Sequence, residues 1–298
     1  MQISIIIPNW NGKRLLEKNL PAVVNAKGNS KNNIAEIIVV DDKSTDDSIP
    51  FLESNYGSEV KIIRHRENRG FSSAVNTGVR SAKSPLVCLL NTDVVPSVNF
   101  LEAAIIHFSD PHVFGVSLHE QGYGYAKGKF EDGFMVHDPG KERPEVVDTF
   151  WVSGGSGIFR KETWKELKGM DELLFSPFYW EDIDLSYRAM KRGYRVLWEP
   201  KAQVIHNHES VINEGSFRKG YMNTIKQRNH LLFIWKNLTS PNLFKKHIRG
   251  LMKRVGRHPG YIRIVFMAFL KLLTVRKLRR KEKRESKVSD EAILARFK

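Results

Sequence analysis

The stretch IAEIIVVDDKSTDDS (residues 34–48) divides into an apolar half and a polar half. The first half is a run of mostly β-branched and apolar residues of strand length, which is typical of a strand buried on both faces of a sheet. The second half, from Asp41 onward, is made almost entirely of aspartate, serine and threonine. A buried strand that ends in carboxylates and hydroxyls indicates a ligand-binding edge, because parallel sheets bind ligands beyond the carboxyl ends of their strands.

The same apolar pattern recurs before and after this stretch. Further runs with the composition and length of buried strands are ISIIIP (3–8), EVKIIRH (59–65), SPLVCLLNTD (84–93) and HVFGVSL (112–118). Helices are expected between or after these runs, at residues 13–26, 45–55, 71–82 and 98–108. Continuous apolar strands that alternate with helices predict an α/β fold, with a central and mostly parallel sheet covered by helices on both faces.

The residues that follow the predicted strands are the candidate site: 9–12, 41–44, 68–70 and 91–93. The chain has no G-x-G-x-x-G after its first strand and no G-x-x-x-x-G-K-[ST], which excludes a Rossmann dinucleotide site and a P-loop. Carboxylates and amides at strand ends suit a nucleotide sugar instead. Its base and ribose take hydrogen bonds, and its diphosphate needs a hard cation with oxygen ligands. The pattern therefore favours glycosyl transfer.

The composition limits the class of protein. A chain of 298 residues with 41% apolar content is able to bury a full core. The single cysteine, Cys88, lies in the apolar run PLVCLL, which excludes an internal disulfide and a multi-cysteine metal site and suits a reducing cytosol. The N-terminal MQISIIIPNW has no basic region, and its apolar run ends at Pro8, so we expect a strand and not a signal peptide. A cytoplasmic location is predicted.

The net charge of +15 is concentrated near the C-terminus. Residues 241–298 contain 18 Lys/Arg and 4 Asp/Glu, whereas residues 1–240 contain 30 Lys/Arg and 29 Asp/Glu. We therefore predict a main domain at 1–240, with a nucleotide-binding half at 1–118 and an acceptor-side half at 119–240. A basic amphipathic helical tail is predicted at 241–298.

The predicted tail combines an apolar run, YIRIVFMAFLKLLTV (261–275), with a basic run, RKLRRKEKR (276–284). The apolar run is too short and too charged for a secure transmembrane span. It is typical of an interfacial helix, and the basic run would attract anionic lipid at the inner face of the cell membrane. The alternatives are a helical subdomain packed on the main domain, a surface for a protein partner, and a nucleic-acid contact. Nucleic acid is disfavoured, because no base-reading motif accompanies the cations.

A set of ordered motifs covers the chain from its start to about residue 235: SIIIPNWNG, IIVVDDKSTDDS, ENRGFSSAVNTG, LLNTDVVPS, WVSGGSGIFRKETWKELKGMDELLF, WEDIDLSYRAMKRGYRV and HNHES. In this order they resemble the signature of glycosyltransferase family 2, and within it the rhamnosyltransferase-like branch. The resemblance implies the GT-A nucleotide-diphospho-sugar transferase fold and a nucleotide-sugar donor.

The resemblance assigns the residues after the first strands to the nucleotide. Asp41 occupies the position of the aspartate in the family's VD-x-x-S motif, and it would accept a hydrogen bond from the N–H of uracil or thymine. Asp41 and Asp42 also suit capping of the helix expected after them. The other nucleotide-binding candidates are Pro8, Asn11, Asn68, Gly70, Asn76 and Asn91. Glycine at position 70 would let the backbone approach the nucleotide, and an ordinary turn explains it nearly as well.

Asn91-Thr92-Asp93 occupies the place of the family's D-x-D motif, which holds a divalent cation against the diphosphate. The resemblance implies Mg²⁺ or Mn²⁺ as cofactor, with Asp93 as a direct ligand. Asn91 replaces the first carboxylate by an amide, which removes one negative charge but keeps an oxygen ligand. His206 matches the family's histidine after the last strand and is the second expected ligand. His208 follows at i+2 on an extended segment and would point to the opposite face.

The motif WEDID (180–184) contains the expected general base. Direct displacement by an acceptor hydroxyl needs a carboxylate that takes its proton on the face opposite the leaving diphosphate. The resemblance assigns this role to Asp182 and acceptor binding to Glu181. Asp184 is expected to be a structural acid.

Aromatic and glycine residues flank this motif. Phe178, Tyr179 and Trp180 would offer faces on which a sugar ring stacks, and core packing is the alternative. Trp151 begins the glycine-rich WVSGGSGIFR and is expected to line the acceptor site, while the glycines allow close passage of the backbone. Residues 122–148 show no clear period and are expected to form a mobile loop on the acceptor side.

These features predict an inverting, metal-dependent glycosyltransferase. It would move a hexose or deoxyhexose from a UDP- or dTDP-sugar to a hydroxyl of a glycan or lipid-linked acceptor in cell-surface polysaccharide synthesis. One alternative is a non-catalytic sugar-nucleotide- or membrane-binding homologue, whose altered D-x-D motif has cost it activity. A nucleotidyltransferase is disfavoured, because it would need a glycine- and lysine-rich triphosphate loop near the N-terminus.

Overall fold

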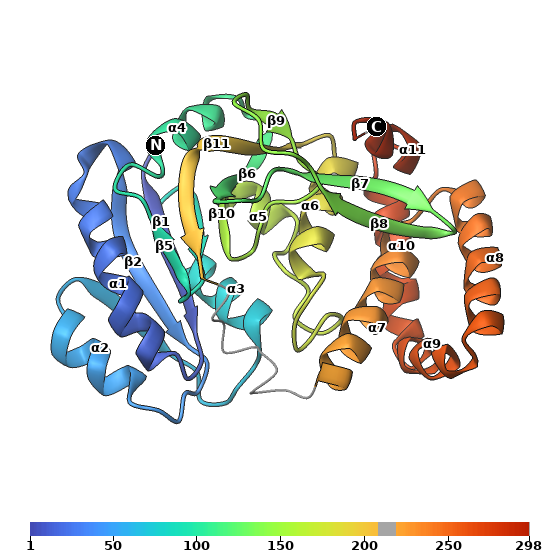
Figure 1. Ribbon diagram of the computed structural model, residues 1–298, viewed down its shortest axis with the longest axis horizontal. Helices are drawn as coiled ribbons and strands as arrows, with labels where there is room; N and C mark the ends of the chain where they lie inside the picture. Colours follow the sequence, from blue (N-terminus) through green and yellow to red (C-terminus); the bar gives the residue numbers. More distant parts are fainter. Residues whose placement is uncertain (208–218, 298) are drawn as a thin grey trace.

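A mixed sheet of nine strands forms the centre of the computed structural model, which describes residues 1–207 and 219–297 (Figure 1). Its strands are β1 (Ile3–Asn9), β2 (Ile34–Asp41), β3 (Val60–Arg64), β4 (Leu86–Leu90), β5 (Val94–Pro96), β6 (Val113–Glu120), β9 (Val147–Asp148), β10 (Ser156–Arg160) and β11 (Arg195–His206). The order is β3-β2-β1-β4-β10-β6-β11-β5, and β9 pairs with β11. β1 to β4 run parallel, whereas β10 runs antiparallel to β4 and β6. The predicted α/β class is confirmed.

Helices cover both faces of this sheet. The helices of the described residues are α1 (Lys13–Gly28), η1 (Ser30–Asn32), α2 (Ser48–Tyr56), α3 (Phe71–Ser81), α4 (Glu102–Ile105), η2 (Ile106–Ser109), α5 (Lys161–Glu166), α6 (Glu181–Lys191), α7 (Lys219–Asn237), α8 (Pro241–Arg257), η3 (Pro259–Tyr261), α9 (Ile262–Phe269), α10 (Leu272–Glu285) and α11 (Asp290–Ala295), and α8 to α10 lie beyond the sheet (Figure 1). Ile5 of β1 shares one core with Leu16 of α1, and Ile6 shares the other with Val75 of α3. Neighbouring strand residues point to opposite faces, so β1 supplies both cores.

The helices expected in the first part of the chain are present, with shifted ends. α2 begins at Ser48 and not at residue 45, because Asp46 accepts hydrogen bonds from the backbone N–H and hydroxyl of Ser48 and from the backbone N–H of Lys13. The segment 98–108 forms only α4, followed by the 3₁₀ helix η2.

Within residues 122–148, β7 (Ala126–Glu131) and β8 (Phe134–Pro139) form an antiparallel hairpin. His230 Nε2 of α7 lies 2.6 Å from the carbonyl oxygen of Met135, and His247 Nδ1 of α8 lies 2.8 Å from that of Gly133. Gly133 has φ +87°, and a Cβ there would lie 2.9 Å from Cα of Gly250. The prediction of a mobile loop is therefore wrong for residues 126–139, which form a hairpin that helices distant in the sequence hold.

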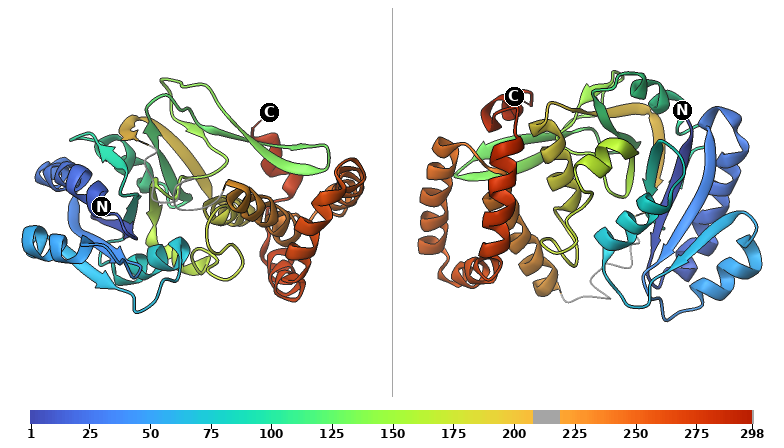
Figure 2. Two further views of the ribbon diagram at one scale, coloured as in Figure 1. Left: turned by 60° about the horizontal axis from the view of Figure 1, so that its bottom comes forward. Right: turned by 180° about the vertical axis from the view of Figure 1, so that it is seen from behind.

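The basic C-terminal segment is packed and does not form a separate tail. Its helices α8 to α11 lie beside α7 and the β7–β8 hairpin in both views of Figure 2. Its buried apolar residues belong to the same core as α6 and α7: Leu243, Tyr261, Ile264, Ala268, Val275, Ile293, Leu294 and Phe297. The predicted boundary at residue 240 is thus not a break in packing. None of the helices in the described part of the chain has the length and apolar character needed to cross a membrane.

Buried ion pairs join this segment to the C-terminal end of α6. Lys191 Nζ lies 2.8 Å from Asp290 Oδ1, and both side chains are fully buried. Asp290 also accepts a hydrogen bond from the hydroxyl of Tyr187. Arg192 Nη1 lies 2.8 Å from Glu282 Oε2 of α10. Because a buried charge without its partner is costly, the position of α6 depends on the packing of α10 and α11.

Asp290→Ala is expected to lower the free energy of unfolding by about 3–5 kcal/mol, because it leaves the buried Lys191 ammonium without its carboxylate. Chemical denaturation followed by circular dichroism measures this change. Glu291→Ala is the matched control, since the adjacent carboxylate is exposed, and it should change stability by less than about 1 kcal/mol. Equally small effects of both variants would contradict the packing of α11 against α6.

Candidate functional site

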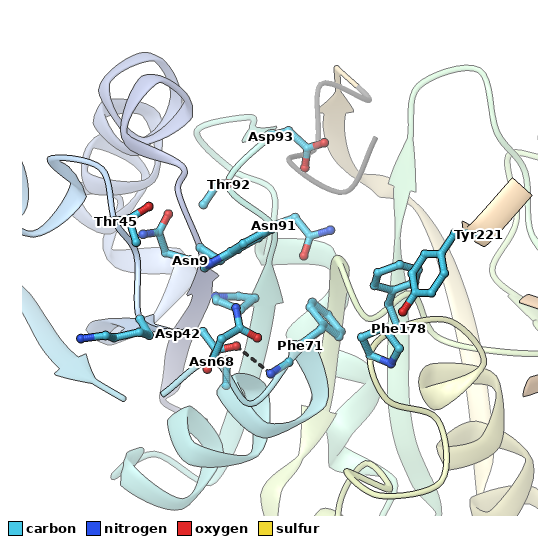
Figure 3. Close-up of a pocket in the computed structure, with 16 residues that line it drawn as sticks. Asn9, Asp42, Thr45, Asn68, Phe71, Asn91, Thr92, Asp93, Phe178 and Tyr221 are labelled. Atoms are coloured by element: carbon cyan, nitrogen blue, oxygen red, sulfur yellow. Dashed lines mark hydrogen bonds between the residues drawn. The ribbon is translucent and has the colours of Figure 1, made fainter. Parts of the chain in front are cut away.

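A cavity of about 550 Å³ lies beyond the carboxyl ends of β1, β2 and β4 (Figure 3). Every predicted strand-end group contributes to its lining: Pro8, Asn9 and Trp10; Asp42 and Lys43; Asn68 and Gly70; Asn91, Thr92 and Asp93. β1 pairs with β2 on one side and with β4 on the other. The cavity therefore lies where the strand order reverses direction, which is the usual ligand position in open α/β sheets. Its volume is within the range of small-molecule sites.

The adjacent aspartates at the end of β2 have different environments. Asp42 lines the cavity, whereas Asp41 is buried behind it. Asp41 accepts hydrogen bonds from the side-chain amide of Asn9 (2.9 Å) and the backbone N–H of Ser44 (3.0 Å). The Asp41 carboxylate is engaged with Asn9 and Ser44, and only Asp42 of the pair contributes to the cavity lining. This placement corrects the assignment of Asp41 as the residue that faces the ligand.

Asp42 also holds the turn that precedes α3. Its carboxylate accepts hydrogen bonds from the backbone N–H groups of Arg69 (2.9 Å) and Gly70 (2.7 Å), and it lies 2.7 Å from His65 Nδ1. Gly70 has φ +82°, and a Cβ there would lie 3.2 Å from the carbonyl oxygen of Pro177. Glycine is therefore required by its conformation and by this close approach.

Asn11 and Asn76 do not line the cavity, in contrast to the prediction. Asn11 Oδ1 accepts a hydrogen bond of 2.7 Å from the backbone N–H of Thr45. Asn76 is buried on α3, where its Nδ2 donates to the carbonyl of Met170 and its Oδ1 accepts from Nε1 of Trp164. Both side chains hold neighbouring segments together and do not face the cavity.

Asp93 and His206 are distant in the sequence and meet at the cavity. β5 and β11 pair in antiparallel register, with Val94 opposite His206, which brings Asp93 Oδ1 to 3.2 Å from His206 Nε2. Glu120, the last residue of β6, lies 3.1 Å from His206 Nδ1. Burial disfavours the protonated ring, but the neighbouring carboxylates outweigh it and raise the pKa of His206 to about 9. His208 lies outside the described residues.

The donor set at Asp93 suits a divalent cation that is shared with a ligand. Both of its carboxylate oxygens are buried, and Oδ1 faces the ring of His206 at 3.2 Å, so the pair holds a proton where a cation would bind between the two side chains. In the described ranges, no three or more Asp, Glu, His or Cys side chains are arranged to hold an ion by themselves. Mg²⁺ sites often use one or two carboxylates and complete their shell with phosphate oxygens and water. The residues present therefore fit a cation bound together with a diphosphate.

Asp182 lies close to the cavity at the start of α6. Its Oδ2 accepts a hydrogen bond from the backbone N–H of Gly154 (3.2 Å). A Cβ on Gly154 would lie 3.3 Å from Cβ of Asp182 and 3.4 Å from the ring of Phe71, which lines the cavity. A Cβ on Gly155 would collide with the side-chain amide of Asn91 at 2.5 Å. The glycines thus allow the start of α6 to approach the end of β4, as expected from the glycine-rich motif.

The carboxyl groups of Glu181 and Asp182, at the start of α6, are hard to ionise. Burial raises the pKa of Asp182, and hydrogen bonds from the backbone N–H groups of Gly154 and Ile183 offset part of this effect. Glu181 is only 6% exposed, and its Oε2 accepts no hydrogen bond in the described part of the chain. Burial, and then the nearby Asp182 carboxylate, raise the pKa of Glu181 well above its usual range. Glu181 does not line the cavity.

The tryptophans predicted to bind the acceptor belong to the core. Trp180 stacks on His230, with ring centroids 4.4 Å apart and planes at 5°, and it is buried. Trp151 is partly buried and meets the ring of His137 edge-on, with centroids 4.6 Å apart. The stacking role expected of Trp180 is corrected, because helix α7 already covers its ring.

Other aromatic and acidic residues at the site were not singled out from the sequence. Phe71 and Tyr221 line the cavity together with Phe178, the one member of the expected aromatic wall that does so. Glu120 lies two residues beyond the predicted strand 112–118, because β6 continues to Glu120. No local signal indicates Tyr221, because nothing in the sequence places α7 beside the cavity.

Glu181→Gln is expected to stabilise the protein increasingly as pH rises. In the native state the pKa of Glu181 lies above its unfolded value, so its contribution to stability is complete at acidic pH and is lost as the buried carboxyl ionises. The glutamine does not ionise and avoids this loss. Urea denaturation across a pH series should show the two unfolding free energies diverging above the ordinary carboxyl range. Glu162→Gln, an exposed position in the first turn of α5, is the control, and an equal pH response there would contradict the assignment.

Solved structures share this fold at low sequence identity. GalNAc-T7 with UDP, GalNAc and Mn²⁺ aligns with a TM-score of 0.65 at 17% identity, over 88% of this chain and 57% of that chain. The mannosyltransferase PcManGT from Pyrobaculum calidifontis, in complex with GDP-Man and Mn²⁺, aligns with a TM-score of 0.57 at 16% identity, over 99% and 85%. S. aureus TarS with UDP aligns with a TM-score of 0.56 at 17% identity, over 88% and 74%. The fold is GT-A.

Curated relatives match most of the chain. The pre-mycofactocin glycosyltransferase of Mycobacterium tuberculosis is 29% identical over 232 residues, which are 74% of this chain and 45% of the relative. The chain thus spans less than half the length of that protein. The O-antigen chain rhamnosyltransferase RfbN of Salmonella typhimurium is 21% identical over 72% of this chain and 69% of the relative, in agreement with the predicted resemblance to rhamnosyltransferases. Residues 4–166 match the family described as glycosyl transferase family 2, and because this match covers more than half of the chain, the protein belongs to that family.

Proposed function

We propose that the protein is an inverting glycosyltransferase that moves a sugar from a UDP- or dTDP-sugar to a hydroxyl of a glycan or lipid-linked acceptor in cell-surface polysaccharide synthesis. The observation that carries this proposal is the convergence of Asp42, Asn91 and Asp93 on one cavity with Asp182 beside it. Sugar transfer needs a nucleotide-diphosphate site and a base next to it. Relatives named as glycosyltransferases, and a neighbour of the same fold with UDP and Mn²⁺, support this interpretation.

The nucleotide would occupy the part of the cavity formed by the ends of β1 and β2 and by the turn before α3. The Asp42 carboxylate would accept a hydrogen bond from the N–H of the base. Asp41 would act behind it, by fixing Asn9 and Ser44 through hydrogen bonds. The nucleotide would also be lined by Pro8, Asn68, Gly70 and Asn91.

Asp93 and His206 would hold Mg²⁺ or Mn²⁺ beside the diphosphate. When bound, such a cation neutralises the charge that develops on the leaving group. Asn91 would place an amide oxygen at the same edge of the sheet, where the family motif has a carboxylate. The site then carries one negative charge fewer, so we expect cation binding to depend more strongly on the diphosphate.

Asp182 would accept the proton of the acceptor hydroxyl as that oxygen attacks the anomeric carbon. The new bond would form on the face opposite the breaking sugar–phosphate bond, which inverts the configuration. The backbone N–H groups of Gly154 and Ile183 hold the carboxylate in one orientation. Burial raises the pKa of Asp182, which makes its ionised form a stronger base.

The acceptor would bind between the cavity and the start of α6. Phe178 and Tyr221 border the cavity there and offer aromatic faces to a sugar. Glu181, Trp180 and Trp151 would support this region from the core, without direct contact. The basic segment 241–298 would hold the enzyme at the inner face of the cell membrane, where lipid-linked acceptors are available.

Asp182→Asn is expected to reduce sugar transfer by about 100-fold or more, because the amide cannot accept the acceptor proton, while the affinity for the nucleotide changes little. Transfer is measured with a panel of nucleotide sugars, and affinity by isothermal titration calorimetry. Near wild-type turnover of this variant would assign the base elsewhere. Wild-type protein that binds a nucleotide sugar but neither transfers nor hydrolyses it would favour the non-catalytic homologue, the alternative raised by Asn91.

Asp93→Ala is expected to abolish the gain in UDP affinity that Mn²⁺ produces, because it removes the buried carboxylate that faces the proposed cation. Calorimetric titration of UDP with Mn²⁺ and with excess chelator measures this gain. Asn91→Asp is the companion variant, and the added carboxylate should increase the gain. Equal UDP affinity of the wild type with Mn²⁺ and with chelator would rule out the shared cation.

A further inference from the structure

Helix α9 has apolar side chains on both its covered and its exposed side. Ile264 and Ala268 are buried in the core that α9 shares with α7. On the remaining surface of the same helix, Ile262, Phe266 and Phe269 are 56%, 61% and 56% exposed. Arg263 is the one charged residue of this helix. A helix that is apolar on nearly all sides is normally buried or placed at a membrane, so one face of α9 lacks the partner that its composition requires.

The exposed apolar surface continues over the turn into α10. Leu270 is 70% exposed and Leu273 is 82% exposed. Leu173 is also exposed, and Lys271 Nζ donates a hydrogen bond to its carbonyl oxygen, which places the two segments side by side. These exposed side chains form an apolar corner that consists of Ile262, Phe266, Phe269, Leu270 and Leu273. Exposed apolar patches of this kind mark contacts with a protein or a membrane.

A basic groove borders the apolar corner. It has a volume of about 860 Å³ and lies between α3, the loop 167–173 and α10. Leu173 is part of its lining and links it to the apolar corner. Its buried cations Arg188 and Lys236 are paired with Asp184. The exposed cations of the basic groove are Arg80, Lys168, Lys277, Arg280 and Arg284, of which Arg80 pairs with Glu172 at 3.5 Å.

Helix α9, which carries most of the apolar corner, and the strand ends that form the cavity lie toward the same side of the molecule in Figure 1. α9 packs against α7, whose first turn carries Tyr221 of the cavity lining. In Figure 1, α9 lies toward the lower side, to which the arrows of β1 and β11 also point. A flat partner that covers the apolar corner would therefore lie on the side where the strands end.

We propose that the apolar corner and the basic groove bind the surface of an anionic lipid bilayer. The apolar side chains would enter the boundary between headgroups and acyl chains, and the lysines and arginines would bind lipid phosphates. α9 has 8 residues, or about 12 Å at about 1.5 Å per residue, which suits a helix that lies along the interface. Binding through this surface would turn the cavity toward the bilayer, so that a lipid-linked acceptor could reach the cavity directly. Only this last step rests on the proposed function.

Charge favours a bilayer over a second copy of the chain as the partner. Residues 241–298 carry 18 Lys/Arg and 4 Asp/Glu. Two copies that met at the apolar corner would bring like charges together. An anionic bilayer supplies opposite charge beside an apolar phase, which matches the groove and the corner together.

Vesicle flotation tests the two parts of the surface separately. The wild type is expected to bind phosphatidylcholine vesicles that contain phosphatidylglycerol, and to bind phosphatidylcholine alone far more weakly. Phe266→Ser combined with Leu273→Ser should weaken binding by about tenfold or more at every salt concentration, because less apolar area is buried. Lys277→Glu combined with Arg280→Glu should weaken it by about tenfold or more at low salt and reduce its salt dependence.

Matched controls lie away from the proposed surface. Ile106→Ser changes an apolar side chain that is 64% exposed, next to α4 on the upper side of Figure 1. Lys83→Glu reverses an exposed charge just before β4, at the edge of the sheet opposite the cavity. Both controls should bind vesicles as the wild type does. Controls as weak as the surface variants, or surface variants that bind as the wild type does, would overturn the proposal.

A fluorescent label identifies the side that touches the bilayer. Cys88 is fully buried, so a cysteine introduced by Phe269→Cys can be labelled selectively. Bimane at this position should shift to shorter wavelength with anionic vesicles, and bimane on Ile106→Cys should not. Equal shifts at both positions, or no shift at either, would refute the proposed surface. A shift at position 269 that grows with protein concentration in the absence of vesicles would show that the partner is a second copy of the chain and not a bilayer. UDP binding in the same samples tests the proposed function independently, so the failure of the membrane surface and the failure of the proposed function can be told apart.

Discussion

Parallel pairing of β1 with β2 and with β4 is the constraint on which the site depends. The register sets Asn9 opposite Asp41 and places β4 along the other edge of β1, so backbone hydrogen bonds bring the ends of distant segments to one place. The polar side chains there are tied to one another, Asn9 to Asp41 and Asp42 to the backbone of Gly70. This part of the cavity wall therefore extends the hydrogen bonding of the sheet.

Helix α6 connects this edge to the remainder of the molecule. Its first turn carries Asp182, held by the N–H of Gly154, and its last residue is Lys191, held by Asp290 of α11. The helix has 11 residues and is buried along most of its length, so it is positioned at both ends by segments that are far apart in the sequence. The C-terminal segment consequently has an inner side that packs against α6, whose first turn carries Asp182, and an outer side that carries the proposed membrane surface.

Much of the fold followed from local pattern. Strand-length apolar runs, each followed by polar residues, predicted the parallel half of the sheet and the edge at which Asp42, Asn68 and Asn91 line one cavity. Such patterns are readable because the side-chain periods of strands and helices are fixed by backbone geometry. The pairing of Asp93 with His206 has a different origin, since it came from the order of family motifs and not from spacing, and the register of β5 with β11 accounts for their contact.

The sequence by itself determined the α/β class, the four groups of residues at the cavity and the position of Asp182 at the start of a helix, because these depend on residues that are neighbours in the chain. Only the tertiary structure decided which of Asp41 and Asp42 faces the cavity, since that depends on the side to which the last strand residue points. It also decided that Asn76 and Trp180 are engaged with distant partners. The packing of residues 241–298 was settled in the same way, because a buried pair such as Lys191 with Asp290 joins positions that share no local pattern.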